Sequence, residues 1–311
     1  MTFQHRVFNH WMQECDEKVI EEMTSSQPIW FGRVGGSDAD AVRNTDPDRV
    51  DYHRSRVSEL NGYFDKDDDP KNFADFLTMY AASCDQMDLA MVGGGAYIRE
   101  ILEGQNTEFL ECFRVRDITS FCFIEATKFF LKSFKVWGEG KKILVVSPFS
   151  RSVEQQVKQM GKFFTTSLPQ CEFVTYTAPI TYSSGINSPE YLRYFDEVTA
   201  GLRNWHEVAA KMFAEIRELD FDVAWLSCGS YAMQLGPRIK NELGKKSIYV
   251  GSGVNLLFNI YGQRFQEHLP KVADPRYEID PLENDIFLGE TQKVHRGGIS
   301  AYFGERSVAR C

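Results

Sequence analysis

Short apolar runs alternate along the chain with longer amphipathic stretches whose apolar positions have the spacing of a helix. The apolar runs predict buried strands at 29–31, 88–93, 143–147, 172–176, 222–227 and 247–250. The amphipathic stretches predict helices at 1–23, 38–45, 72–84, 96–103, 150–165, 188–218 and 230–242. Strands that alternate with helices in this way are typical of parallel sheets. The pattern therefore predicts an α/β, Rossmann-like fold with a mostly parallel sheet and helices on both faces.

Three of the expected strands end in turns of small residues that open the next helix. The run 221–232 gives a strand, then the turn Ser-Cys-Gly-Ser at 227–230, then a helix. The same order occurs at 142–152 and at 88–95, which ends in three glycines. The first N–H groups of a helix lack partners within it, and the helix dipole adds positive potential there. Such turns predict a nucleotide or another phosphorylated ligand at the carboxyl edge of the sheet.

Hydroxyl groups and glycines in these turns are suited to ligand contact. Small side chains let the backbone approach a phosphate or a ribose closely. The serines also have a simpler role, because Ser147 and Ser230 are in position to cap their helices. A later turn at 251–253 reads Gly-Ser-Gly and is followed by Asn255. It permits close approach of a base or ribose, and it equally fits an ordinary tight turn.

The turn at 32–38 reads Gly-Arg-Val-Gly-Gly-Ser-Asp and carries charges of both signs. Arg33 offers a bidentate grip on phosphate. A carboxylate such as Asp38 or Asp40 can hold a hard divalent cation that bridges a diphosphate. The alternative interpretation is a glycine turn with a surface arginine and an aspartate that caps the helix.

Composition and charge narrow the class of protein. The chain has 311 residues and a formal net charge of −9, which argues against a protein that coats nucleic acid. It has no apolar run of about 18 residues and no basic-then-apolar leader, so we expect a soluble, cytoplasmic protein without a transmembrane segment. The seven cysteines lack C-x-x-C spacing, and His53, His206 and His295 are dispersed. The sequence thus predicts neither a disulfide framework nor a zinc site.

Two blocks of the chain resemble glycosyltransferases of the GT-D type. The turn at 33–38 resembles the Arg-x-Gly-Asp-Gly-Glu signature of that group. The block 142–149, Lys-Ile-Leu-Val-Val-Ser-Pro-Phe, with Ser152 after it, is similar to a block of a lysine, a strand and Ser-Pro-Phe in bacterial members.

Further blocks extend this resemblance in the same order along the chain. The segments 220–231, 244–248 and 256–265 are similar to three consecutive blocks of the group, and 61–64 and Trp205 also have counterparts. Together the blocks cover most of residues 29–265.

The resemblance implies an activity and a cofactor. The implied activity is transfer of a hexosyl or pentosyl group from a nucleotide-sugar donor, with a uridine diphosphate leaving group, to a hydroxyl of a glycan or glycoconjugate, as in polysaccharide biosynthesis. In the GT-D site an Asp-x-Glu pair holds a divalent cation, Mn²⁺ or Mg²⁺. Here Gly36 stands where the first acid belongs and Asp38 where the glutamate belongs. We therefore expect Asp38 to be the metal ligand and metal binding to be weak or dispensable.

Two carboxylates are candidates for catalysis. Removal of the proton from an acceptor hydroxyl requires a base beside the donor, for which Asp38 is the first choice and Asp40 the second. The metal role and the base role of Asp38 both stay open. The residues expected to bind the nucleotide-sugar are Arg33, Gly35, Gly36, Ser147, Phe149, Ser152, Ser227, Gly229, Ser230, Gly251 and Ser252.

We expect one α/β glycosyltransferase domain over 1–311, in which 1–140 completes the cleft, 141–265 forms the core and 266–311 is a C-terminal wrap or lid. Two other functions remain possible: a non-catalytic nucleotide-sugar binding protein, or another nucleotide-dependent Rossmann enzyme. The latter is disfavoured because no G-x-G-x-x-G follows the first strand. The acidic run at 65–69 predicts a solvated loop before a helix, with metal binding as the less favoured interpretation.

Overall fold

The computed structural model describes residues 17–34, 36–44, 46–92, 118–119, 133–163, 168–182, 189–262 and 273–287. Several expected features lie outside these ranges. They are residues 1–16 of the first expected helix, Gly35, the glycine turn at 93–95, the helix at 96–103, His295 and much of the expected lid at 266–311.

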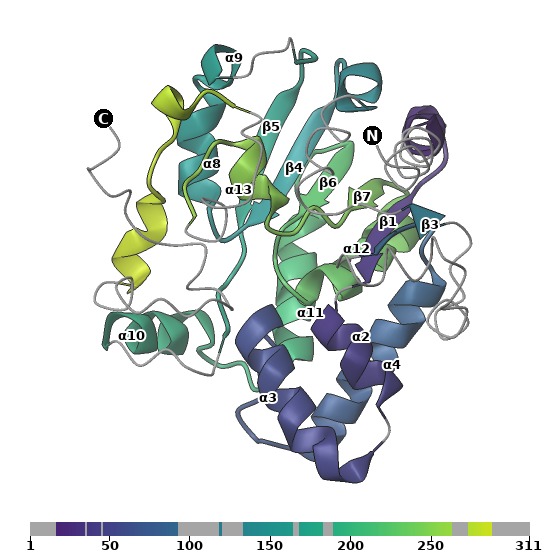
Figure 1. Ribbon diagram of the computed structural model, residues 1–311, viewed down its shortest axis with the longest axis vertical. Helices are drawn as coiled ribbons and strands as arrows, with labels where there is room; N and C mark the ends of the chain where they lie inside the picture. Colours follow the sequence, from purple (N-terminus) through teal and green to yellow (C-terminus); the bar gives the residue numbers. More distant parts are fainter. Residues whose placement is uncertain are drawn as a thin grey trace, which may run out of the picture.

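The described strands form one seven-stranded sheet with the order β3-β2-β1-β7-β6-β4-β5 (Figure 1). Every pair of neighbouring strands in it is parallel. The strands are β1 (Trp30–Val34), β2 (Leu89–Val92), β3 (Ile118–Thr119), β4 (Lys142–Ser147), β5 (Glu172–Thr177), β6 (Val223–Leu226) and β7 (Lys246–Ile248). The expected α/β, Rossmann-like fold with a parallel sheet is confirmed.

The order of the strands reverses between β4 and β6. From β4 the chain steps outward to β5, whereas from β6 it steps the opposite way to β7, which pairs with β1. In open parallel sheets a ligand binds beyond the carboxyl ends of the strands at such a reversal. The carboxyl ends of β4 and β6 are therefore the expected position of a ligand, and those of β7 and β1 continue the same edge of the sheet.

Helices and short 3-10 turns connect the strands. The helices are α2 (Gly36–Arg43), α3 (Val50–Asn61), α4 (Pro70–Asp85), α8 (Ser150–Val157), α9 (Met160–Phe163), α10 (Pro189–Val198), α11 (Trp205–Ile216), α12 (Tyr231–Leu243) and α13 (Gly253–Leu257). The 3-10 turns are η1 (Pro47–Arg49), η3 (Pro275–Tyr277) and η4 (Leu282–Phe287), and residues 17–24 are also helical.

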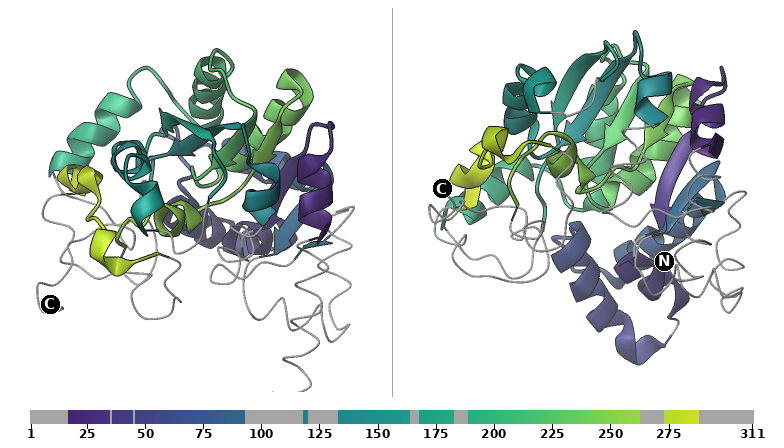
Figure 2. Two further views of the ribbon diagram at one scale, coloured as in Figure 1. Left: turned by 90° about the horizontal axis from the view of Figure 1, so that it is seen from above. Right: turned by 45° about the horizontal axis from the view of Figure 1, so that its top comes forward.

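Apolar packing covers both faces of the sheet, and helices lie on both sides of it in Figure 2. On one face, the Trp225 ring of β6 lies 5.1 Å from the ring of Phe134 and 5.6 Å from that of Phe173. On the other face, Trp30 of β1 packs against Gly236 of α12, where an added Cβ would fall 2.2 Å from the indole. Both tryptophans are fully buried, so the sheet is the centre of the core.

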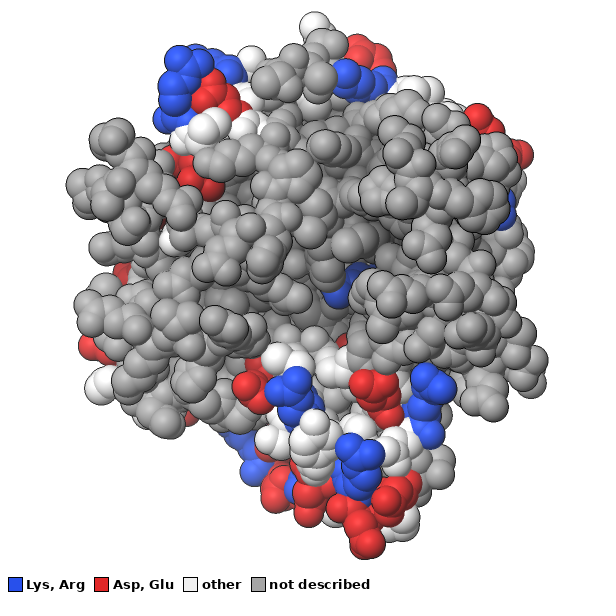
Figure 3. All heavy atoms as spheres, viewed as in Figure 1, with Lys and Arg blue, Asp and Glu red and all other residues white. Residues whose placement is uncertain are grey.

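Helices α2, α3 and α4 lie below the sheet in Figure 1, at the edge where β1 and β6 end. The backbone joins them to the sheet there, because the N–H of Ser230, just after β6, donates to the carbonyl of Asn61, the last residue of α3. Figure 3 shows basic and acidic side chains intermixed over this lower part of the molecule. These three helices thus cover the carboxyl edge on which the candidate site lies.

Some expected boundaries were wrong. The single helix expected at 188–218 is two helices, α10 and α11. Gly201 has a φ of 73° in the loop between them, and the side chain of Asn204 accepts hydrogen bonds from two N–H groups at the start of α11. A left-handed glycine followed by an asparagine cap ends one helix and begins another. The helix expected at 150–165 is likewise divided into α8 and α9.

Candidate functional site

Asp38 is a buried carboxylate in the first turn of α2, directly beyond β1. Its side chain is 4% exposed, and Oδ1 accepts a hydrogen bond of 3.3 Å from Ser230 Oγ. Burial raises the pKa of this carboxyl from 3.8 to about 6, although Asn61, Ser230 and Arg33 act to lower it. A carboxyl group with a pKa near neutrality can both carry charge at pH 7 and accept a proton.

Arg33 brings a positive charge to the same edge of the sheet. Its guanidinium carbon lies 5.7 Å from the centre of the Tyr249 ring, just after β7. A Cβ added to Gly251 would fall 3.0 Å from Arg33 Nη1, so glycine leaves room for the guanidinium. Arg33 therefore joins the carboxyl ends of β1 and β7, and its contact with the aromatic ring helps to orient it.

The last residue of α3, Asn61, contacts the turn that begins α12. The N–H of Ser230 donates to the Asn61 carbonyl at 2.9 Å. Gly229 has a φ of 60°, and a Cβ there would fall 2.4 Å from the same carbonyl oxygen. Asn61 also donates from Nδ2 to Ser37 Oγ at 2.7 Å. Asn61 thus ties α2, α3 and α12 together around Asp38, and Gly229 faces this carbonyl.

Ser227 and Cys228 begin the same turn and are both buried. The N–H of Ser227 donates to the carbonyl of Val146 in β4 at 2.8 Å, which extends the sheet by one residue. Burial raises the pKa of the Cys228 thiol above its ordinary value of 9.0. Because the thiolate is the reactive form, Cys228 is a packing residue at neutral pH.

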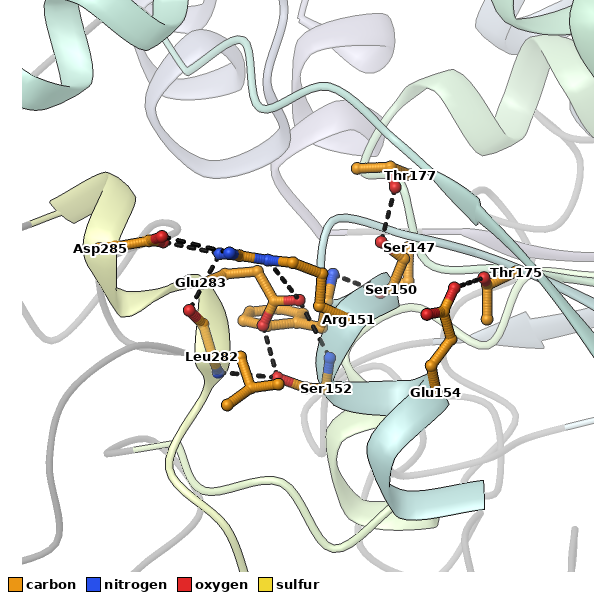
Figure 4. A network of polar contacts seen from close by, with 11 residues as sticks. Ser147, Ser150, Arg151, Ser152, Glu154, Thr175, Thr177, Leu282, Glu283 and Asp285 are labelled. Atoms are coloured by element: carbon orange, nitrogen blue, oxygen red, sulfur yellow. Dashed lines mark hydrogen bonds and ion pairs between the residues drawn. The ribbon is translucent and has the colours of Figure 1, made fainter. Parts of the chain in front are cut away.

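In the turn that opens α8, the hydroxyls of Ser147 and Ser150 form hydrogen bonds with other groups of the chain (Figure 4). The N–H of Phe149 donates to Ser147 Oγ at 3.1 Å, and both residues are buried. The hydroxyls of Ser150 and Thr177 share a hydrogen bond of 2.6 Å. These contacts fix the turn between β4 and α8 against the end of β5.

A carboxylate from the C-terminal segment lies at the start of α8 (Figure 4). Glu283 of η4 accepts from the N–H of Ser152 at 3.1 Å and from its hydroxyl at 2.5 Å. The hydroxyl in turn accepts from the N–H of Leu282 at 2.9 Å. Arg151 adds an ion pair with Asp285 at 2.6 Å. The chain's own carboxylate thus takes both polar groups of Ser152.

The turn after β7 holds buried polar groups of another kind. Among the described residues, neither the hydroxyl of Ser252 nor the amide nitrogen and oxygen of Asn255 has a hydrogen-bond partner. Asn255 is fully buried in α13. Buried polar groups without partners are rare in folded proteins, because they lose water and gain nothing in exchange.

Among the described candidates, neither Asp40 nor Gly36 adds a ligand beside Asp38. Asp40 is exposed on α2, and residues two positions apart on a helix do not share a face. Gly36 begins α2 and has no side chain to ligate a cation. Gly35 lies outside the described residues.

The donor set around Asp38 does not fit a tightly held divalent cation. Hard cations take several oxygen ligands, commonly from more than one carboxylate. Within the described ranges, no group of three or more His, Cys, Asp or Glu side chains is arranged for a metal. The positive charge of Arg33 already interacts with the Asp38 carboxylate. Oδ1 of Asp38 also accepts a hydrogen bond from Ser230.

The acidic run at 65–69 pairs with basic side chains and N–H groups. Asp67 accepts from Arg203 Nε at 2.8 Å, and Asp68 forms an ion pair with Arg54 at 2.7 Å. Asp69 caps the start of α4. The run is thus a loop before a helix, and its carboxylates contact arginines and backbone.

Comparison of the chain with models of protein families, with curated proteins and with solved structures finds no match. None of the described helices has the length and apolar character needed to cross a membrane.

The residues that the turn motifs did not single out come from distant segments. Asn61 and Tyr249 contact the site residues, and Glu283 lies at α8. An aromatic residue just after a strand was a usable signal for Tyr249. Nothing in the local sequence links Glu283 to Ser152, because 131 positions separate them.

Proposed function

We propose that the protein transfers a sugar from a nucleotide-sugar donor, with uridine diphosphate as the leaving group, to a hydroxyl of a glycan or glycoconjugate. The observation that carries the proposal is the buried Asp38 beside Arg33 at the carboxyl end of β1. A proton acceptor and a phosphate-binding cation at one sheet edge are what this reaction needs. The resemblance of the turn at 33–38 to the GT-D signature supports the same assignment.

In this proposal Asp38 and Arg33 divide the chemistry. The acceptor oxygen forms a bond to the anomeric carbon, while the bond from that carbon to the diphosphate oxygen breaks and its electron pair leaves with the diphosphate. Asp38 takes the proton of the acceptor hydroxyl, for which a pKa of about 6 is well matched at neutral pH. Arg33 stabilises the negative charge that develops on the leaving diphosphate.

Arg33 replaces most of what a cation does for the diphosphate in this proposal. The sparse donor set around Asp38 supports weak or dispensable binding of Mn²⁺ or Mg²⁺, and no step is assigned to the ion. Metal dependence is measured by donor turnover at graded Mn²⁺ with a chelator control.

A second candidate is a protein that binds a nucleotide-sugar without turning it over. It is favoured by one observation, the glycine at position 36 where the GT-D signature has an acid. Binding without release of nucleoside diphosphate from any donor, at high protein concentration and with an acceptor mixture present, would support this candidate over transfer.

The first test is a thermal-shift panel followed by calorimetry. Uridine diphosphate should stabilise the protein, and nicotinamide dinucleotides and S-adenosyl compounds should not. Arg33→Ala should weaken diphosphate binding tenfold or more, since a charge-assisted contact contributes about 1.5–3 kcal/mol. Arg56→Ala is the matched control, because Arg56 is exposed on α3 and pairs with Glu59. If the folded Arg33→Ala variant binds uridine diphosphate as tightly as the wild type does, Arg33 is not part of the site.

A further inference from the structure

Asn255 presents both a hydrogen-bond donor and an acceptor inside the protein, and the described part of the chain pairs neither. Its side chain is 0% exposed, and neither Nδ2 nor Oδ1 has a partner among the described residues. The hydroxyl of Ser252 is also buried and without a partner. Ser252 occupies the N-cap position of α13, yet its side chain makes no capping bond. Both residues therefore keep polar groups buried without a local structural use.

The two residues are neighbours, and Ser252 follows the glycine that faces Arg33. The N–H of Asn255 donates to the carbonyl of Ser252 at 3.2 Å, and residues three apart share one side of a helix. Ser252 directly follows Gly251, where an added Cβ would fall 3.0 Å from Arg33 Nη1.

A carboxamide pairs best with a neutral ligand edge that offers an acceptor beside a donor. Nucleobases have such edges, and asparagine binds them with both of its polar atoms. We propose that Asn255 binds the polar edge of the nucleobase of a nucleoside diphosphate, with the Ser252 hydroxyl beside it, while Arg33 holds the diphosphate. This deepens the proposed function and rests on it for the identity of the ligand as a nucleotide.

The experiment compares two ligands that share only part of their structure. Uridine carries the nucleoside alone, and pyrophosphate carries the diphosphate alone. Asn255→Leu, which has a similar size, should weaken binding of uridine and of uridine diphosphate at least tenfold and leave pyrophosphate binding within twofold. Arg33→Ala should weaken pyrophosphate binding and leave uridine binding within twofold.

A matched control removes a buried hydroxyl elsewhere. Ser83 in α4 also has an unpartnered buried hydroxyl, and its carbonyl accepts from Trp30 Nε1 at the amino end of β1. Ser252→Ala should weaken uridine binding at least threefold, and Ser83→Ala should not change it. If Asn255→Leu does not fold, as judged by circular dichroism, Asn255→Ala replaces it in the same titrations.

Several outcomes separate this inference from the proposed function. Wild-type affinity for uridine in Asn255→Leu, or no uridine binding by the unmodified protein at millimolar concentration, overturns the inference and leaves an ordered water as the partner of Asn255. Asn255-dependent uridine binding without sugar transfer from any donor supports the inference and counts against the transferase. Transfer at the wild-type rate and donor KM in Asn255→Leu rejects the inference alone.

Discussion

Two helices begin at the carboxyl edge of the sheet, and each meets a buried carboxylate from another segment of the chain. At α8, Glu283 accepts from both the N–H and the hydroxyl of Ser152. At α12, Asp38 accepts a long bond of 3.3 Å from Ser230 Oγ, and the N–H of Ser230 donates to Asn61 instead. The same local feature, a serine at a helix start, thus meets its carboxylate through different contacts.

The difference separates a structural role from a chemical one. Glu283 accepts two hydrogen bonds from Ser152 and fastens the segment 273–287 to α8. At Asp38 the effect of burial outweighs the hydrogen bonds from Asn61 and Ser230, so its pKa rises to about 6. A buried carboxylate becomes reactive at neutral pH where the loss of water outweighs the hydrogen bonds that the fold gives it. The predictions below test this contrast, beginning with the largest effect.

Asp38→Asn should lower the rate of sugar transfer by about 10²-fold or more, because general base catalysis contributes about 10²–10⁴-fold. Asparagine keeps the size of the side chain and an acceptor for Ser230, but it cannot take a proton. The measurement is kcat at saturating donor. Glu283→Gln is the control and should keep a rate near that of the unmodified protein. A wild-type rate in Asp38→Asn would remove both the catalytic role of Asp38 and the alignment of the turn with the GT-D signature.

The stability contributed by Asp38 should depend on pH. Its folded pKa of about 6 lies above the ordinary value of 3.8, so the folded state binds the proton more tightly. The associated stability is present below pH 3.8 and is lost as pH rises through about 6, a total of about 3 kcal/mol. Urea unfolding of the wild type and of Asp38→Asn should show the variant gaining in relative stability between about pH 4 and pH 8. A constant difference across that range would contradict the buried, proton-binding carboxyl.

The fold was largely predictable because its signals are local. Apolar runs marked most of the strands, and the order of strands and helices fixed a parallel sheet. Helix α3 was missed because its buried residues are only His53, Val57 and Ser58, too few for a clear apolar period. The two-residue strand β3 left no readable run of its own.

The candidate site was predictable only in part, because long-range contacts decide it. The turns gave Arg33, Asp38 and Ser230, which the structure brings together. They could not show that Glu283 reaches Ser152, or that Asn61 closes the turn at Gly229, since these contacts depend on tertiary packing. Ser152 and Ser230 both stand at helix starts, and contacts with distant segments decide which of their polar groups are left to bind a ligand.

Glu283→Gln should destabilise the protein by about 1–3 kcal/mol, because the hydrogen bonds that Ser152 donates lose their charged acceptor. Its side chain is 2% exposed, so water does not replace the lost interaction. The measurement is the free energy of unfolding in urea at pH 7. Asp285→Asn is a matched control, because Asp285 is exposed and its pair with Arg151 should contribute less than about 1 kcal/mol. Equal effects of the two variants would mean that Glu283 is no more important than a surface ion pair.

Gly229→Ala and Gly201→Ala separate backbone strain from the packing of Asn61 at α12. Both glycines have positive φ, 60° and 73°, so each alanine should cost about 1 kcal/mol or somewhat more in backbone strain. Only at Gly229 would the new Cβ meet another group, the Asn61 carbonyl at 2.4 Å, whereas Gly201 has nothing within 4 Å. We therefore expect Gly229→Ala to lose a further ~1 kcal/mol of unfolding free energy and to weaken the contact that orders Ser230 beside Asp38. Unfolding in urea gives the first quantity, and the rate of sugar transfer relative to Gly201→Ala gives the second. If both variants lose the same stability and the same activity, the contact of Gly229 with Asn61 does not position Ser230 beside Asp38. The difference between the serine–carboxylate contacts at α12 and at α8 then has another cause.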